Sequence, residues 1–269
     1  MIGRRTAMIL PTLAPGALVT AAAATGPDQP AAAKRRQVNI VVVPNMVQLD
    51  VTGPFEVLAR VPGWSVSLVA ATMEPVRTDR GLRLTPDATR ESAARSDLLV
   101  VPGGTGVDTA MLDPAWLAFV QREAATAEYV FGVCTGSLLL AAAGLLEGRR
   151  AGGHWQARDL LAQFGVTPSD DRMTVDGKYY TSGGVTSGID MALRVVADLQ
   201  GEMTARKIQL AIEYDPHPPF PGGTPFTSPP DVVQAVLTDS RRRRADREGM
   251  VAQAAAALRQ SREAASATQ

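Results

Sequence analysis

The sequence is poor in the residues from which disulfides and metal centres are built. It contains one cysteine, Cys134, and two histidines, His154 and His217, among 269 residues. A single cysteine excludes an internal disulfide and a cysteine-based metal cluster. The chain also lacks an excess of basic charge, because 27 lysines and arginines balance 27 aspartates and glutamates. A general nucleic-acid binder needs a basic surface, so we expect no nucleic acid as partner and no metal.

Long apolar runs are absent as well, and the N-terminal region is only weakly hydrophobic. Arg4 and Arg5 precede an uncharged stretch, residues 6–25, which two prolines interrupt and in which residues 21–24 are all alanine. This pattern predicts an export signal and leader over residues 1–36, of a kind compatible with twin-arginine export to the periplasm, and no membrane anchor in the mature form. The alternative is an Ala-rich leader on a cytoplasmic protein.

What the chain does contain is an alternation of short apolar runs with helical segments. Residues 38–43 and 98–101 are β-branched or aliphatic almost throughout, and residues 129–133 are β-branched and aromatic, as in strands that are buried on both faces. Amphipathic stretches such as residues 113–126 lie between them. The sequence therefore predicts an α/β fold, a mostly parallel sheet with helices on both faces.

The most informative stretch is residues 129–137, where an apolar run passes through Gly132, Cys134, Thr135 and Gly136 into a Leu/Ala-rich helix. This is the spacing of a nucleophile elbow with cysteine in place of serine. The glycines are explained by a sharp strand-to-helix turn, which leaves no room for side chains beside the nucleophile. A helix N-terminus favours thiolate and lowers a cysteine pKa from ~8.5 to roughly 3.5–7.5. We therefore expect Cys134 to be a reactive thiol rather than a small core residue.

Two further predicted strand ends carry polar or glycine residues. Asp50 lies at the junction of the first strand and a helix that contains Pro54 in its first turn. Gly103 and Gly104 follow the strand at residues 98–101 directly. Because the carboxyl ends of parallel strands share one crevice, we expect Asp50, this glycine loop and Cys134 to meet there, with the backbone N–H groups of Gly104 and Thr135 forming an oxyanion hole. The alternatives are a helix-capping carboxylate and a tight turn.

From residue 228 the composition changes to Ala, Arg, Glu and Gln, with four consecutive arginines at 241–244. We divide the chain into the leader, residues 1–36, a catalytic domain, residues 37–227, and a C-terminal tail, residues 228–269. The tail is expected to be a solvated helix or partly disordered. Its arginine run is expected to be a solvated face rather than a binding surface.

Several of these motifs together resemble one family. The segments are Asp50–Glu56, Pro102–Gly104, Gly132–Gly136, His154–Trp155, Thr181–Gly184 and Glu213–Phe220. They resemble the ThiJ/PfpI superfamily, with its flavodoxin-like, class I glutamine amidotransferase-like sandwich, and within it the isonitrile hydratase branch. The resemblance covers residues 38–225 and leaves the leader and the tail outside it.

The resemblance implies a catalytic Cys134, an acidic partner at Asp50 and a supporting Thr135. It further implies substrate contacts at Gly103, Gly104, His154, Ser182 and Gly183, a small-molecule substrate, no cofactor and a homodimer. The implied activity is hydration of an isonitrile to an N-substituted formamide through a thioimidate on Cys134. The peptidase members of the superfamily have histidine directly after the cysteine, and Thr135 stands there in this chain. Alternatives are another ThiJ/PfpI-type hydrolase, a glyoxalase-like enzyme, and a ligand- or redox-sensing module without catalysis.

Overall fold

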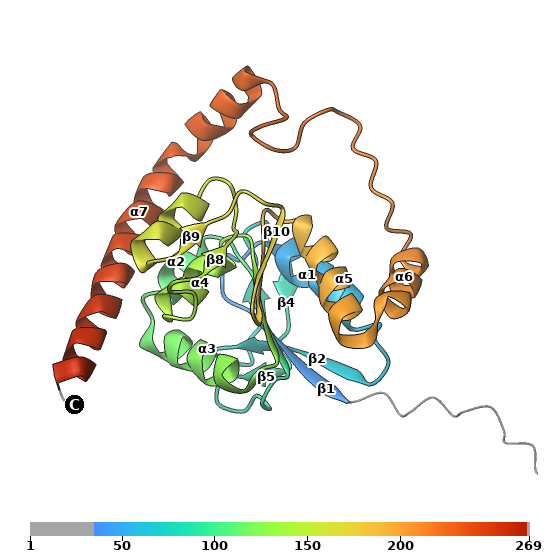
Figure 1. Ribbon diagram of the computed structural model, residues 1–269, viewed down its shortest axis with the longest axis horizontal. Coiled ribbons are helices and arrows are strands. Elements are labelled where there is room, and N and C mark those ends of the chain that lie inside the picture. Colours follow the sequence, from blue (N-terminus) through green and yellow to red (C-terminus); the bar gives the residue numbers. More distant parts are fainter. Residues whose placement is uncertain (1–34, 268–269) are drawn as a thin grey trace, which may run out of the picture. The chain divides into compact units, whose positions relative to one another are not determined.

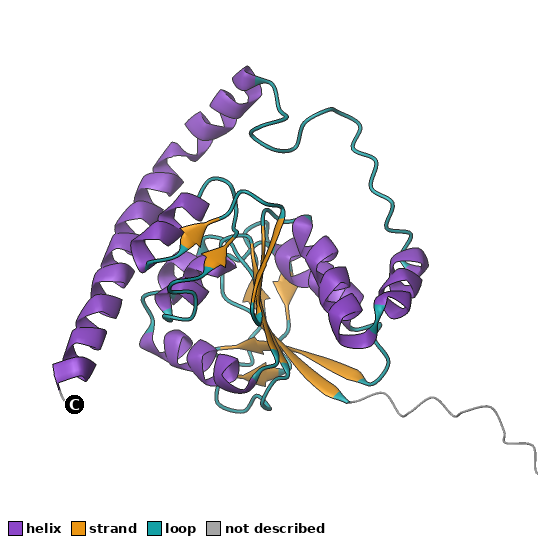
Figure 2. Cartoon of the chain, viewed as in Figure 1, coloured by secondary structure: helices purple, strands orange, loops and turns teal. Residues whose placement is uncertain are grey.

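The computed structural model of the chain describes residues 35–267. Nearly all of the predicted export signal lies outside these residues. Within them, a seven-stranded sheet has the strand order β10-β11-β7-β6-β1-β2-β5, and every neighbouring pair is parallel except β10 and β11 (Figure 2). Its strands are β1 (Arg36–Val41), β2 (Trp64–Ala70), β5 (Ala88–Thr89), β6 (Leu98–Val101), β7 (Tyr129–Val133), β10 (Met173–Asp176) and β11 (Tyr179–Ser182). The predicted α/β class and mostly parallel sheet are therefore confirmed.

Two small two-stranded sheets accompany the large one. They are β3 (Val76–Arg77) with β4 (Arg83–Leu84), and β8 (Arg150–Ala151) with β9 (Thr167–Pro168). β10 and β11 form an antiparallel hairpin, in which Asp176 pairs with Tyr179.

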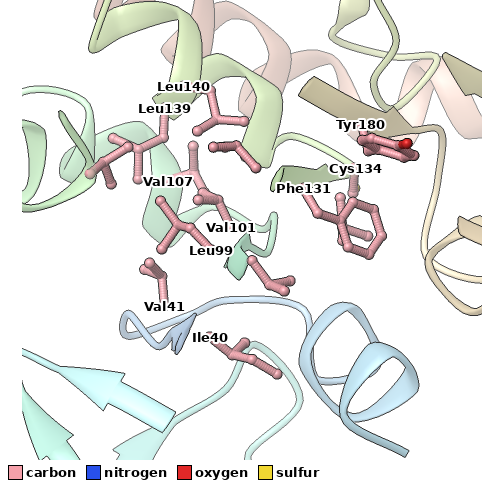
Figure 3. Close-up of a cluster of buried hydrophobic side chains, with 14 of the residues drawn as sticks. Ile40, Val41, Leu99, Val101, Val107, Phe131, Cys134, Leu139, Leu140 and Tyr180 are labelled. Atoms are coloured by element: carbon pink, nitrogen blue, oxygen red, sulfur yellow. The ribbon is translucent and has the colours of Figure 1, made fainter. Parts of the chain in front are cut away.

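The central strands are fully buried because helices cover both faces of the sheet. All four residues of β6 are buried, and Leu99 and Val101 are among the buried hydrophobic side chains labelled in Figure 3. β6 and β7 pair in a register that sets Val101 beside Gly132. Since the two strands end at the same level, the loop after β6 and the turn after β7 begin side by side.

The helices form a layer on each face of the sheet (Figure 1). α1 (Gln48–Leu58), α5 (Ser187–Gln200) and α6 (Glu202–Ala211) lie on one side, and α2 (Gly106–Ala110), α3 (Pro114–Thr126) and α4 (Gly136–Ala142) on the other. α3 begins as its sequence predicts, since the Asp113 side chain accepts a hydrogen bond from Ala115 N–H and Pro114 occupies the first turn. After His154 the chain makes a turn and then forms the 3₁₀ helix η1 (Arg158–Phe164).

The C-terminal tail is one continuous helix, α7 (Pro230–Ala267), which packs against α2, α4 and η1 (Figure 1). Its Val251, Ala254 and Ala255 are buried, and so is Arg247. The tail is helical, as one of the two expectations had it, and most of its residues are exposed, but one face is packed rather than solvated. The pattern did not reveal this face because small or polar residues, with Val251, form it. None of the helices in residues 35–267 is both long and apolar enough to cross a membrane.

Candidate functional site

The turn between β7 and α4 has the geometry of a nucleophile elbow. Cys134 has a positive φ of 57°, which is rare for a residue with a side chain. A Cβ added at Gly136 would lie 1.9 Å from the carbonyl oxygen of Val101, so only glycine fits at this position of the turn. The backbone N–H of Cys134 donates to the carbonyls of Ser182 (3.2 Å) and Gly183 (3.0 Å), which fixes the strained turn to the end of β11.

Asp50 lies in the first turn of α1 and is completely buried. Its Oδ2 accepts a hydrogen bond from the backbone N–H of Gly103 at 3.0 Å, while Oδ1 has no partner of standard geometry among residues 35–267. Burial raises the pKa of Asp50 to about 7, because desolvation outweighs the Gly103 bond and the Cys134 thiol, which interacts with this carboxyl group. The negative charge of Asp79 adds to the increase. Asp50 can therefore hold or release a proton near neutral pH.

The Cys134 thiol does not have the lowered pKa that its place before a helix predicts. Only 4% of the residue is exposed, and burial raises the pKa of the thiol, with the Asp50 carboxylate raising it further. The N–H of Thr135 donates to the sulfur and acts in the opposite direction, but it is the smaller influence. The prediction placed Asp50 near Cys134 but did not include the desolvation of the thiol or the effect of that carboxylate on its pKa. Asp50 and Cys134 thus titrate as a coupled pair that keeps one proton between them above about pH 7.

The Thr135 hydroxyl locks the elbow to the glycine loop after β6. Its Oγ1 accepts a hydrogen bond from the N–H of Gly104 at 2.9 Å, and all of these groups are buried. The predicted oxyanion role of the Gly104 N–H is therefore wrong, because that donor is already used. The N–H of Thr135 is the remaining backbone donor beside the sulfur. A Cβ at Gly103 would lie 2.5 Å from Thr135 N and 2.9 Å from Asp50 Oδ2, so glycine is needed for this close approach.

His154 lines the same pocket as Cys134, and the backbone N–H of His154 donates a hydrogen bond to the carbonyl oxygen of Cys134 at 3.2 Å. Its Nδ1 accepts a hydrogen bond from Gln156 N–H at 3.3 Å. Burial, followed by the charges of Arg247 and other arginines, lowers the pKa of His154 to about 4. The imidazole is therefore neutral at physiological pH and supplies no positive charge.

The last two predicted contact residues sit at the end of β11. Ser182 is completely buried and acts on the site through its carbonyl, which accepts from Cys134 N–H. Gly183 lines an adjoining pocket, to which His154 also belongs. The fold therefore brings Asp50, Gly103, Gly104, Cys134, Thr135, His154, Ser182 and Gly183 to one edge of the sheet.

Cys134 and Thr135 open into a cavity of about 420 Å³. One wall comes from α7, which contributes Arg243 and Arg247. Sequence reasoning missed both residues as part of the site. The arginine run was visible, but only the fold brings it against the pocket. No group of three His, Cys, Asp or Glu residues in the described part of the chain is arranged to hold a metal ion.

Comparisons with known proteins agree with this architecture. A sequence model of the DJ-1/PfpI family matches residues 36–198. The isonitrile hydratase of Pseudomonas putida is 46% identical over 209 residues, which cover 78% of this chain and 90% of that protein. The HTH-type transcriptional regulator CdhR of Pseudomonas aeruginosa is 34% identical over 153 residues, which cover 54% of this chain and 43% of the regulator. The crystal structure of a ThiJ/PfpI family protein from Pseudomonas syringae has a TM-score of 0.80 and 36% identity, and the match covers 86% of this chain and 98% of that one.

Proposed function

Because this chain belongs to the DJ-1/PfpI family, we propose that its Cys134–Asp50 site hydrates an isonitrile to an N-substituted formamide. One observation carries the proposal. A thiol on a tight strand-to-helix turn lines a cavity and interacts with a buried carboxyl group, in a chain 46% identical to an isonitrile hydratase. This pair can supply both the nucleophile and the proton that addition to an isonitrile carbon requires.

The first step is addition of the thiol across the terminal carbon of the isonitrile. The sulfur of Cys134 forms a C–S bond, and the proton that the pair shares moves to the same carbon, so that the N≡C group becomes N=CH–S. Asp50 is left as a carboxylate. Thr135 N–H, which lies beside the sulfur, stabilises negative charge on the sulfur before attack.

The second step is hydrolysis of this thioimidate. Water attacks the carbon, the Asp50 carboxylate takes its proton, and the nitrogen receives that proton through Asp50. Asp50 then removes the proton of the new hydroxyl group as the C=O bond forms and the C–S bond breaks. The sum is one isonitrile plus one water giving one formamide, with the thiol–carboxylate pair restored.

The test is turnover of cyclohexyl isocyanide, followed by appearance of the formamide, with the wild type, Cys134→Ala and Asp50→Asn. We expect product with the wild type and none with Cys134→Ala. An adduct of Cys134 that gains the mass of the substrate, trapped at low pH, supports the thioimidate. An inert wild type rejects the substrate class, and an active Cys134→Ala variant rejects the nucleophile.

Other members of the family act as glyoxalases or sensors, so methylglyoxal belongs in the same assay. Residues 230–267 form one continuous helix, α7, and no helix-turn-helix. A redox-sensing role predicts oxidation of Cys134 without turnover of any substrate.

We also propose that residues 1–36 direct export to the periplasm and that the mature protein is a homodimer. The paired arginines at positions 4 and 5, before a weakly apolar stretch, support export. Cell fractionation tests the location. Full-length protein in the cytoplasmic fraction would contradict export. Sedimentation or light scattering tests the dimer.

A further inference from the structure

The C-terminal helix provides a wall of the active-site cavity, although the sequence placed it outside the catalytic domain. Arg243 and Arg247 of α7 line the cavity together with Cys134, Thr135 and His154. The two arginines are one helical turn apart, so they lie on the same face of α7. The cavity that receives the substrate is thus completed by two guanidinium groups.

Arg247 holds the helix in place and is already neutralised. Its Nε and a terminal nitrogen form a bidentate ion pair with Asp108 of α2 at 2.6 and 3.0 Å, and both side chains are buried. Arg244 fixes the neighbouring part of α7 through two bonds to Asp159, at 2.7 and 2.6 Å, and one to the carbonyl of Gln156. These contacts set the register of α7 against the pocket.

Arg243 is different, because its guanidinium forms no ion pair with an acid of residues 35–267. The other charges of the cavity are matched, since Arg80 pairs with Asp79 at 3.5 Å and Arg247 with Asp108. Arg243 nevertheless faces the site, because its charge contributes to lowering the pKa of His154. His154 itself is neutral, so Arg243 is the positive charge left to meet a ligand.

From this arrangement we infer that Arg243 selects substrates that carry a carboxylate on the side of the molecule away from the isonitrile group. The inference rests on the proposed isonitrile hydration and names its substrate class. The uncharged isonitrile end reaches Cys134 at the floor, above the buried Asp50, and the anionic end stays at the α7 wall. A guanidinium is the group best suited to such an anion, because it can bind both carboxylate oxygens.

The first test reads the charge of the pocket and requires no turnover. Cys134 is the only cysteine in the chain, so its alkylation is followed by mass spectrometry without interference. The rates with iodoacetate, an anion, and iodoacetamide, its neutral counterpart, are compared for the full-length protein. Their ratio cancels changes in the thiolate fraction, because both reagents react with the same thiolate. We expect Arg243→Gln to lower the iodoacetate-to-iodoacetamide ratio about 3- to 10-fold at low salt.

Arg242→Gln is the matched control, since Arg242 is exposed on the same helix and does not line the cavity. It is expected to leave the ratio within twofold of the wild type. An equal ratio in all three proteins, or an equal fall in both variants, overturns the inference whatever the protein's activity.

The second test compares kcat/KM for isocyanoacetate and its neutral methyl ester. The wild type should prefer the anion, and Arg243→Gln should lose about 3- to 10-fold of that preference while Arg242→Gln keeps it. Turnover of the ester without preference for the anion overturns the selection by Arg243 and leaves isonitrile hydration standing. If the protein turns over none of isocyanoacetate, its methyl ester and cyclohexyl isocyanide, both the selection by Arg243 and the proposed isonitrile hydration are overturned.

Discussion

The carboxyl group of Asp50 interacts with the thiol of Cys134 beside the cavity, and the two effects have opposite signs: the thiol lowers the pKa of the carboxyl group, whereas the carboxylate raises the pKa of the thiol. Asp50 comes from the first turn of α1 and Cys134 from the elbow after β7, 84 positions later in the chain. The pair resembles two acids that share a proton, since the pKa of Asp50 is raised to about 7 and that of Cys134 is raised as well. Several measurable properties depend on this relationship.

Activity should follow the loss of the first proton from the pair. In the doubly protonated pair no base is present, so kcat/KM for an isonitrile should rise with pH through about 7. Asp79→Asn removes a negative charge that raises the pKa of Asp50, so this variant should move the midpoint to lower pH. Asp50→Asn should lose about 10²- to 10⁴-fold in kcat/KM and show no midpoint near 7. A midpoint retained in Asp50→Asn would assign the titration to another group.

Stability should depend on pH through the same carboxyl group. Folded Asp50 binds its proton up to about pH 7, whereas the unfolded residue loses it near 3.8, so the contribution of Asp50 to stability falls as pH rises between these values. Asp50→Asn should therefore be more stable than the wild type at pH 8, by up to about 4 kcal/mol, and show no gain at pH 4. Urea denaturation at the two pH values measures the difference. Asp171→Asn, which changes an exposed carboxylate whose pKa is lowered by Arg150, is the control expected to give no such gain.

The hydroxyl of Thr135 should matter for position rather than for chemistry. Thr135→Val leaves the buried N–H of Gly104 without an acceptor, which should cost about 1–3 kcal/mol of stability. The displaced glycine loop also carries the Gly103 N–H that holds Asp50, so kcat/KM should fall by about 10²-fold. Thr135→Ser keeps the oxygen and should restore most of both properties. Equal losses in the two variants would contradict a role for the hydroxyl bond.

His154 should contribute contacts but no proton transfer. Its pKa of about 4 leaves the imidazole neutral throughout the range in which Asp50 titrates. His154→Gln should therefore lower kcat/KM without moving the midpoint near pH 7. A shifted or missing midpoint in this variant would mean that the histidine takes part in the titration.

The ion pair between Arg247 and Asp108 should determine whether α7 stays docked. Burial raises the pKa of Asp108 even though Arg247 pairs with it, so the carboxylate depends on its partner. Arg247→Met should destabilise the protein by about 3 kcal/mol and expose α7 to limited proteolysis. The double variant Arg247→Met with Asp108→Leu removes both charges and should recover most of that stability. A double variant as unstable as the single one would show that the charge left unpaired is not the cause.

Local sequence patterns were sufficient for most of the elements and for the tight turn that carries Cys134. Strands buried on both faces appear as unbroken apolar runs, and the glycines around Cys134 are required by sterics within a few residues of it. Because parallel strands end at a common edge, even the meeting of Asp50, Gly103 and Cys134 was predictable from three separate motifs.

The tertiary structure alone decided the properties that arise from burial and from long-range contacts. A helix N-terminus predicts a low pKa for Cys134, yet desolvation and the facing carboxylate raise it, and neither is encoded near residue 134. The Gly104 N–H is expected to meet the substrate, but the Thr135 hydroxyl occupies it. The arginine run of α7 has the composition of a solvated surface, yet Arg243 of this run lines the cavity, on a helix that a buried ion pair between Arg247 and Asp108, more than a hundred residues earlier, holds in place. The pKa and the pairing of a charged group in a low-dielectric interior depend on which distant groups the fold brings near it. A local sequence window does not contain that information.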